Sequence, residues 1–315
     1  MQGFKDFDPA KDIRDLSGTV ILVTGGLGEE SVRALAAHSP LHIYFTGRNV
    51  TAANALIADI KSKHPRTSLS FIKMDLSSLC AVKEAIARDF KHDRLDTLMN
   101  NAGIIAKPAV LSTDGYEIQF ATNYLGHVML TRELMPILLK TAKDPGADVR
   151  VISNTSAGYE FHRAIRGGIA FDELEAGSAM SRMMLGAWIR YGQSKLANIL
   201  FAAELARRHP ELTSVAIHPG LVKTPMNAEM AGWSKTFVNV TSRMSGEKWL
   251  EPHEGVLNQL WCAAGAEKEA LRNGGYYTPG GVDSTEKLTV EAKDQALAGG
   301  LWEWTEKLLL KYCRD

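Results

Sequence analysis

Short apolar runs alternate with longer amphipathic runs along almost the whole chain, and this alternation leaves few folds open. The apolar runs predict buried strands, and the runs between them place apolar residues at helical spacing. This order is typical of an α/β fold in which helices cover both faces of a doubly wound parallel sheet. We expect one such domain over residues 1–315. The predicted strands are 19–24, 41–46, 69–73, 95–100, 148–153, 213–217 and 275–278. The predicted helices are 29–38, a segment around 56–60, one between 73 and 95, a long helix within 116–142, 191–209 and one near 253–266.

The charge of the chain argues against nucleic acid as a partner. There are 36 basic and 36 acidic side chains, so the formal net charge at pH 7 is zero. A nucleic-acid-binding protein usually has an excess or a stripe of Lys and Arg, and neither is visible here. We therefore expect a small-molecule partner. The sequence leaves open whether copies of the chain form a homo-oligomer.

Cysteine usage and the lack of long apolar runs bear on location. Cys80, Cys262 and Cys313 are far apart and form no C-x-x-C pair, so we expect reduced thiols and no metal site. Residues 1–16 are mixed in charge and lack the apolar region of a signal peptide. No apolar run approaches the roughly 18 residues of a membrane helix. These features predict a cytoplasmic protein without a transmembrane segment.

Two stretches interrupt the alternation, at residues 157–190 and 223–250. Both follow predicted strands, on the side where open α/β sheets bind ligands. We interpret them as segments that cover a substrate, with plain surface insertions as the alternative. Methionine-rich walls adapt to irregular shapes, so a medium-sized hydrophobic ligand is expected. The apolar side chains in question include Met180, Met183, Met184, Leu185, Met226, Met230 and Trp233.

A glycine-rich turn, T-G-G-L-G, follows the first predicted strand and precedes a predicted helix. A helix N-terminus directs backbone N–H groups and a partial positive charge at a phosphate, and glycines let the backbone approach the ligand closely. The strand–turn–helix context is that of a Rossmann-type dinucleotide site. The turn therefore predicts cofactor contacts from Gly25, Gly26 and Gly28.

Tyr191 and Lys195 form a second motif, Y-x-x-x-K. A spacing of four places both side chains on one face of the predicted helix. A free phenol has a pKa of about 10, and a nearby ammonium favours the phenolate and lowers that pKa. Such a tyrosine can donate a proton to a carbonyl oxygen or accept one from an alcohol. An exposed helix pair is the alternative interpretation of this motif alone.

With these motifs the sequence resembles the short-chain dehydrogenase/reductase family, especially its larger fungal and retinol-dehydrogenase-like members, over roughly residues 17–280. The resemblance implies a catalytic set of Asn123, Ser156, Tyr191 and Lys195. In the family the serine hydrogen-bonds the substrate oxygen, the asparagine holds a proton-relay water, and the lysine holds the nicotinamide ribose.

The resemblance also implies where a dinucleotide would bind. Arg48 stands where an NAD enzyme would carry Asp or Glu for the ribose, and it resembles a contact to the 2′-phosphate of NADP. A solvated surface cation is the alternative. NADP(H) is therefore the expected cofactor. Further implied positions are Asp75 and Leu76 at the adenine, Asn101, Ala102 and Gly103 in the N-N-A-G motif on the adenosine side, Pro219 and Gly220 beside the nicotinamide, and Thr224 at the carboxamide.

The glycine turn departs from the family pattern T-G-x-x-x-G-x-G, with which it aligns only if three residues are removed. Three residues span up to about 10 Å, so the loop around the pyrophosphate should be tightened or lost. Glu29 and Glu30 then occupy the first helical turn, where carboxylates would repel a phosphate. The alternative is that these glycines only connect a strand to a helix and no cofactor binds.

Three functions stay open at this stage. The first is an NADP(H)-dependent carbonyl reductase or alcohol dehydrogenase with a hydrophobic substrate. The second is an enzyme that uses Tyr191, Lys195 and Ser156 for isomerisation, dehydration or cyclisation without a redox cofactor. The third is a non-catalytic binding protein on the same fold, which would not need all four catalytic residue types.

Overall fold

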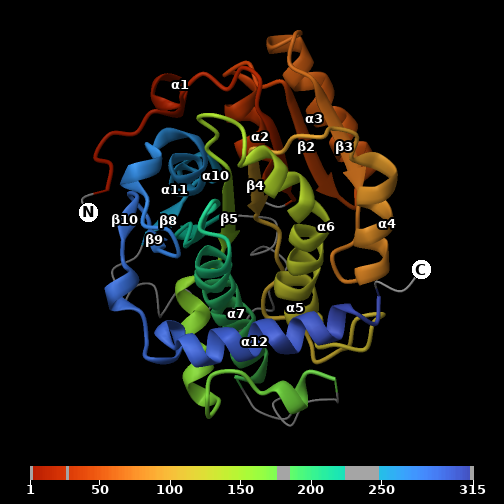
Figure 1. Ribbon diagram of the computed structural model, residues 1–315, viewed down its shortest axis with the longest axis vertical. Coiled ribbons are helices and arrows are strands. Elements are labelled where there is room, and N and C mark those ends of the chain that lie inside the picture. The colour runs from red at the N-terminus through yellow and green to blue at the C-terminus, as the bar shows by residue number, and fades with distance from the viewer. Residues whose placement is uncertain (1–2, 26–27, 176–184, 224–247, 313–315) are drawn as a thin grey trace.

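The computed structural model describes residues 3–25, 28–175, 185–223 and 248–312. Its main sheet has eight strands in the order β10-β9-β6-β5-β4-β1-β2-β3, and all pairs are parallel except β10 with β9 (Figure 1). Every strand predicted from the sequence is present, so the α/β fold and the single domain are confirmed. The strands are β1 Val20–Thr24, β2 His42–Gly47, β3 Leu69–Lys73, β4 Thr97–Asn100, β5 Arg150–Asn154, β6 Thr213–Ile217, β9 Tyr276–Thr278 and β10 Val282–Asp283.

Helices cover both faces of the sheet because its strands are apolar on both sides. In β1, Leu22 packs into one core cluster, while Ile21 and Val23 pack into the other. Such continuous apolar strands are typical of parallel sheets. On the side of Leu22 lie α4 Leu79–Asp89, α6 Gly126–Thr141 and α7 Gly186–Arg208; on the opposite side lie α2 Gly28–Ala36, α3 Val50–Lys63, α10 Pro252–Gly255 and α11 Leu257–Leu260.

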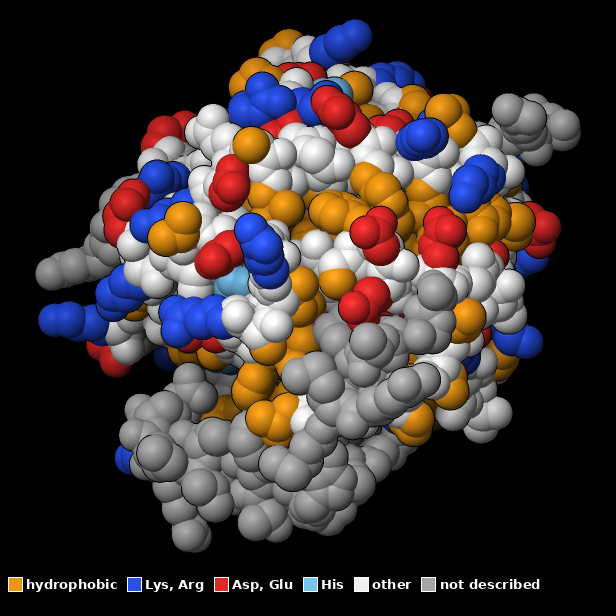
Figure 2. Space-filling view, turned by 90° about the horizontal axis from the view of Figure 1, so that it is seen from below, with side chains coloured by type: hydrophobic (Ala, Val, Ile, Leu, Met, Phe, Trp, Pro, Cys, Tyr) orange, Lys and Arg blue, Asp and Glu red, His pale blue; other side chains and the backbone are white. Residues whose placement is uncertain are grey.

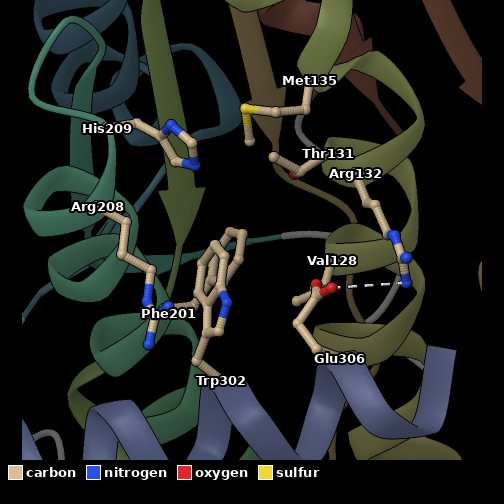
Figure 3. A pocket seen from close by; sticks show the side chains of 9 residues that line it. All are labelled: Val128, Thr131, Arg132, Met135, Phe201, Arg208, His209, Trp302 and Glu306. Carbon is tan, nitrogen blue, oxygen red and sulfur yellow. Dashed lines mark ion pairs between the residues drawn. The ribbon is translucent and has the colours of Figure 1, made fainter. Parts of the chain in front are cut away.

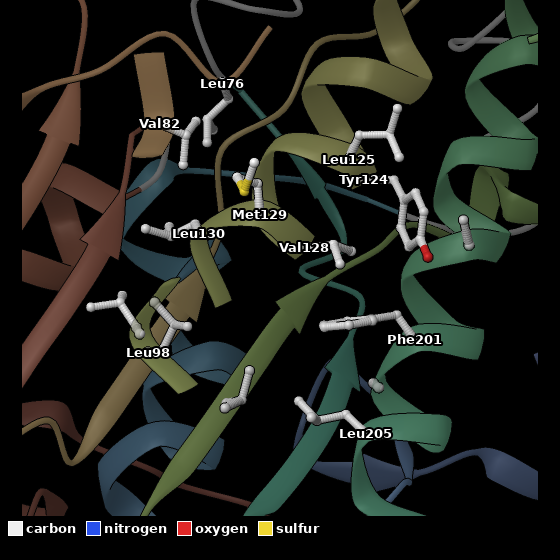
Figure 4. Packing of buried hydrophobic residues seen from close by; sticks show 14 of the residues in the cluster. Leu76, Val82, Leu98, Tyr124, Leu125, Val128, Met129, Leu130, Phe201 and Leu205 are labelled. Atoms are coloured by element: carbon white, nitrogen blue, oxygen red, sulfur yellow. The ribbon is translucent and has the colours of Figure 1, made fainter. Parts of the chain in front are cut away.

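The larger core cluster lies between the sheet and α6 and α7. Leu98 of β4, Met129 of α6 and Phe201 of α7 are among its fully buried members (Figure 4). Each such side chain stabilises the fold by about 1.5–3 kcal/mol through removal from water. This packing fixes α7 against the sheet, and α7 carries Tyr191 and Lys195.

Two helix predictions differ from the structure, and a third is confirmed. The long helix predicted within residues 116–142 is α6, and it follows α5 Ile118–Phe120 and a π-helical stretch Ala121–Leu125. The predicted helix 191–209 already begins at Gly186, so the expectation of irregular chain up to residue 190 is wrong for its last turn. Sequence periodicity missed this turn because it contains the buried charge Arg190. The predicted helix 253–266 is divided into α10, α11 and a second π-helical stretch.

Several short or terminal elements were not predicted. The helix α12, Gln295–Leu309, crosses the outer side of α7 (Figure 1). The other additions are α1 Pro9–Asp12, the 3-10 segments Ala157–Ala164 and Phe171–Glu173, and a small sheet in which β7 Leu221–Val222 pairs with β8 Trp249–Leu250. In the part of the chain that the structure describes, no helix is both long and apolar enough to cross a membrane.

Part of the first predicted substrate-covering segment, 176–184, and most of the second, 224–247, lie outside the described residues. The residues concerned include Met180, Met183, Met184, Met226, Met230 and Trp233.

Arg150 at the start of β5 connects the sheet to the helical layer through a fully buried guanidinium. Its Nη1 donates to the carbonyl of Cys262 at 2.8 Å and its Nη2 to the carbonyl of Ala266 at 2.7 Å, and it pairs with Asp148 at 2.5 Å. These carbonyls belong to the end of a helical segment, where backbone acceptors lack intrahelical donors. The buried charge therefore satisfies groups that would otherwise have no partner.

Replacing Arg150 with Met should lower the free energy of unfolding by about 3 kcal/mol or more, because Asp148 and two carbonyls lose a buried partner. Urea denaturation measures the change. Arg88→Met is the matched control, since Arg88 pairs with Asp89 at the surface and should be replaceable without measurable effect. Equal stabilities of the two variants would contradict this role.

Candidate active site

Lys195 lies in the interior of the protein, on the face of α7 that meets the carboxyl end of β5. It is 4% exposed, and its Nζ donates to the carbonyl of Asn154 at 3.1 Å. Asn198 donates to the same carbonyl at 2.9 Å. A Cβ atom on residue 103 would lie 3.4 Å from this Nζ, so Gly103 allows the chain to pass close to the amine. Burial lowers the pKa of Lys195 to about 7.

Tyr191 lies one helical turn before Lys195, with the ammonium nitrogen 5.7 Å from the centre of its ring. Burial raises the pKa of Tyr191 to about 12, and a hydrogen bond with Ser156 works in the opposite direction. The pKa of this phenol is therefore raised and not lowered as the motif predicts, because desolvation is the largest effect on it. Tyr191 holds its proton at neutral pH, as a proton donor must.

Ser156 follows β5, and its side chain hydrogen-bonds the side chain of Tyr191. Its Oγ accepts a hydrogen bond from the backbone N–H of Gly158 at 3.1 Å. Ser156 thereby caps the N-terminus of the 3-10 segment Ala157–Ala164. A Cβ atom on residue 158 would lie 3.2 Å from Cε1 of Tyr191 and 3.4 Å from the serine Oγ. Glycine at this position thus lets the serine segment approach the phenol closely.

Asn123 lies in the π-helical stretch and is fully buried. Its Oδ1 accepts from the N–H of Ile104 at 2.7 Å, and its Nδ2 donates to the carbonyl of Ile104 at 3.0 Å and to Ser194 Oγ at 2.9 Å. Ser194 Oγ in turn donates to the carbonyl of Tyr191 at 2.7 Å. Asn123 therefore connects the chain after β4 to the helix that carries Tyr191.

A cavity of about 640 Å³ opens at the carboxyl ends of β1 to β4. Gly25, Gly28 and Glu29 line one wall, and Arg48 lines the part beyond β2. Among the described residues Arg48 has no ion-pair partner, and it is exposed. Its guanidinium is thus available to an anion. The remaining walls include Asp75, Leu76, Ala102, Gly103 and Ile104, which were all predicted cofactor positions except Ile104.

The glycine turn is tied to the end of β4. The backbone N–H groups of Asn101 and Ala102 both donate to Thr24 Oγ1 at 2.8 Å, and Asn101 Nδ2 donates to the carbonyls of Thr24 and Gly25. Asn101 therefore lies beneath the turn and does not line the cavity. A Cβ atom on residue 28 would lie 3.0 Å from Cγ1 of Val23, so Gly28 permits close packing of α2 on β1. Gly26 lies outside the described residues.

The structure describes all but one of the remaining predicted cofactor residues, which are Asp75, Leu76 and those after β6. The carboxylate of Asp75 accepts hydrogen bonds from the N–H of Ser77 at 2.9 Å and its Oγ at 2.8 Å, and Leu76 is buried. Pro219 and Gly220 follow β6 after one intervening residue, His218, and Gly220 has a φ of +89°. Thr224 lies outside the described residues.

Two buried residues support the site but were not assigned to it from the sequence. His127 Nε2 lies 2.9 Å from Thr24 Oγ1, and its Nδ1 lies 3.0 Å from the carbonyl of Asn123. Burial lowers the pKa of His127 to about 4, so this histidine stays neutral. The other residue is Asn154, whose carbonyl holds Lys195. For His127 the sequence signal was its spacing of four from Asn123, which places the two residues one helical turn apart.

A second cavity, of about 470 Å³, lies between α6, α7 and α12 (Figure 3). Phe201 and Trp302 stack there with their ring centres 5.7 Å apart, and Arg132 pairs with Glu306 at 3.7 Å. None of the predicted site residues that the structure describes lines it. The first cavity is lined by predicted cofactor positions, and Asn123 and Lys195 lie behind one of them, Gly103.

The chain is similar to known oxidoreductases over nearly its whole length. Residues 19–165 match the family described as short chain dehydrogenase. The short-chain dehydrogenase/reductase drtF of Aspergillus calidoustus is 36% identical, and the alignment covers 94% of this chain and 95% of that protein.

Solved structures share the fold. An uncharacterized protein from Mycobacterium paratuberculosis superposes with a TM-score of 0.68 at 25% identity, over 97% of both chains. The NADPH-bound carbonyl reductase from chicken fatty liver superposes with a TM-score of 0.59 at 22% identity, over 87% of this chain and 100% of that one.

Replacing Lys195 with Met should stabilise the protein at neutral pH. The pKa of Lys195 is lowered from 10.5 to about 7, so the folded state resists the charge that the unfolded chain carries. The gain should be on the order of 2 kcal/mol below pH 7 and should shrink as the pH rises towards 10.5, where the unfolded lysine also loses its proton. Urea denaturation at pH 6.5 and pH 9.5 tests this. A less stable variant at pH 6.5 would refute the assignment of a strained, buried lysine.

Proposed function

Because the chain belongs to the short-chain dehydrogenase/reductase family of oxidoreductases, we propose that it interconverts an apolar carbonyl compound and its alcohol with NADP(H). The observation that carries the proposal is the course of the first cavity. It runs from Arg48, beyond β2, past the N-terminus of α2 to Gly103, behind which lie Lys195 and Asn123. This course would bring a bound dinucleotide to the sheet edge at which Tyr191 is proposed to donate its proton.

The residues around this cavity fit a phosphorylated dinucleotide. Gly103 leaves space that a Cβ atom would fill beside Asn123 Oδ1 and Lys195 Nζ. Arg48 offers a cation that pairs with no carboxylate of the described residues, and a cation of this kind is what recognition of a 2′-phosphate requires. Glu29 also lines the cavity and opposes a nearby phosphate, but it is exposed to screening solvent. The dinucleotide, when bound, supplies or accepts the hydride.

Tyr191 is proposed as the proton donor to the carbonyl oxygen. It is neutral at physiological pH because burial raises its pKa to about 12. A Lys195 that becomes fully charged would stabilise the phenolate left after proton transfer. Ser156 contacts the phenol hydroxyl and is proposed to bind the same substrate oxygen. Asn123 is proposed to complete the set by fixing the backbone of Ile104.

The surroundings of Tyr191 favour an apolar substrate. Tyr191 and Trp188 form a small buried cluster that is extended by partly buried apolar residues from several segments. Seen from below, hydrophobic side chains gather in a band across the molecule (Figure 2). We propose that residues 157–190 and 223–250 contribute the substrate cover, and their members at Leu185 and Trp249 already belong to this cluster. The extending residues are Ile105, Ala106, Phe161, Leu185, Leu221 and Trp249.

The test is turnover of a panel of apolar ketones and aldehydes with NADPH or NADH, followed by the absorbance of the reduced cofactor. We expect oxidation of NADPH in preference to NADH, and a loss of at least a hundredfold in kcat for Tyr191→Phe because the proton donor is removed. Tyr44→Phe is the matched control, since Tyr44 is equally buried in β2 but hydrogen-bonds His92 outside the site.

Three results would count against redox catalysis. They are the absence of NADPH and NADH binding, full activity of Tyr191→Phe, and Tyr191-dependent turnover of a carbonyl compound without any cofactor. The last would favour acid–base isomerisation, dehydration or cyclisation, for which the shortened glycine turn is the specific observation.

A further inference from the structure

The segment Gly103–Lys107 follows β4 without regular secondary structure, yet side chains from three helical segments hold it. Asn123 bonds both backbone groups of Ile104. At Lys107 the backbone N–H donates to Gln119 Oε1 at 3.4 Å, and the carbonyl accepts from Arg190 Nη2 at 3.0 Å. The peptide groups at both ends of this short segment are therefore fixed.

Between these fixed points Ala106 has a φ of +50°. A residue with a Cβ atom adopts this left-handed conformation at a cost in free energy, and such backbone persists only where the surrounding structure imposes it. Since hydrogen bonds hold Ile104 and Lys107 on either side, they are the contacts that can impose it. Without them the segment should relax.

The segment separates the two halves of the site. Gly103, Ile104 and Lys107 line the cofactor cavity, whereas Ile105 and Ala106 pack against the cluster of Trp188 and Tyr191. A shift of this segment would therefore change the wall of the cavity and the surroundings of the phenol together.

Arg190 precedes Tyr191 on α7 and is paired with a buried carboxylate. Its Nε lies 3.3 Å from Glu117 Oε1, and the two side chains are only 3% and 4% exposed. Glu117 Oε2 accepts from the N–H of Phe120 at 2.8 Å, which fixes the carboxylate at the start of α5. Buried ion pairs seldom stabilise a fold more than apolar residues of the same volume. The role of this ion pair is therefore to orient Arg190. In that orientation its Nη2 reaches the carbonyl of Lys107.

We propose that Arg190 is a positioning residue for the reaction: oriented by Glu117, it holds the Lys107 carbonyl and thereby keeps Gly103–Lys107 between the cofactor cavity and Tyr191. This inference rests on the proposed function for its catalytic consequence. A planar guanidinium can engage Glu117 and Lys107 at once from a fixed fork, whereas a lysine ammonium is a point charge on a flexible stem.

The experiment compares Arg190→Lys with wild type in two readouts. Hydrogen exchange of peptides covering residues 103–107, measured by mass spectrometry on the free protein, should become at least tenfold faster. The kcat with NADPH and a ketone substrate should fall at least tenfold, because small misplacements of an active-site wall are costly. The melting temperature should change little, since the charge pair with Glu117 is retained.

Two further variants make the test decisive. The double variant Glu117→Gln with Arg190→Met leaves no unpaired buried charge, and it should lose kcat as Arg190→Lys does. Arg132→Lys is the matched control, because Arg132 also joins two helices through a carboxylate, Glu306 of α12, at the second cavity (Figure 3). It should keep both the exchange rate of 103–107 and kcat.

Unchanged exchange in residues 103–107, or a loss of kcat no larger than in Arg132→Lys, would overturn the proposal. If wild-type protein turns over no substrate with NADPH, the proposed function fails. In that case hydrogen exchange alone tests whether Arg190 holds the segment. Faster exchange of residues 103–107 in Arg190→Lys supports this role, and unchanged exchange refutes it.

Discussion

The arrangement of the site depends on the burial of one amine. Lys195 Nζ lies against the carbonyl of Asn154 and behind Gly103, out of contact with bulk water. An ammonium in such a place is costly, and its pKa falls to about 7. An anionic ligand in the adjoining cavity would offset that cost, so that Lys195 would again be protonated. Tyr191 is buried beside it, and this burial raises the pKa of the phenol and keeps it protonated. Under the proposed function, ligand binding and proton donation would be coupled through this one low-dielectric region.

This burial is possible because three chain segments converge at the carboxyl edge of the sheet. The segment after β4, the π-helical stretch with Asn123, and α7 are joined by side-chain bonds to backbone groups. At residues 103 and 158 a Cβ atom would crowd neighbouring site atoms at 3.2–3.4 Å, and glycine avoids this. These contacts hold the segments around Tyr191 close together. Its apolar lining beside Trp188 suits a hydrophobic substrate.

Sequence patterns were sufficient for the strands and for the motif residues, because apolar runs and fixed spacings encode them directly. They could not show that Asn123 lies in a π-helical stretch, since a π turn inside a helix leaves no periodicity of its own. They also gave the wrong direction for the pKa of Tyr191, because spacing reveals the neighbouring lysine but not the degree of burial. The pair of Glu117 and Arg190 was missed for the same reason: charged residues are normally assigned to the surface, and only tertiary packing buries these two.

The most direct test of the account is the number of protons taken up when NADPH binds. Isothermal titration calorimetry at pH 8, in buffers of different ionisation enthalpy, measures it. Free Lys195 is mostly neutral at that pH, because its pKa is about 7, and the phosphates of NADPH should restore its charge. We predict an uptake close to one proton in wild type and none in Lys195→Met. Binding without proton uptake, equal uptake in both proteins, or no binding of NADPH at all would contradict the coupling of cofactor and lysine on which the proposed function depends.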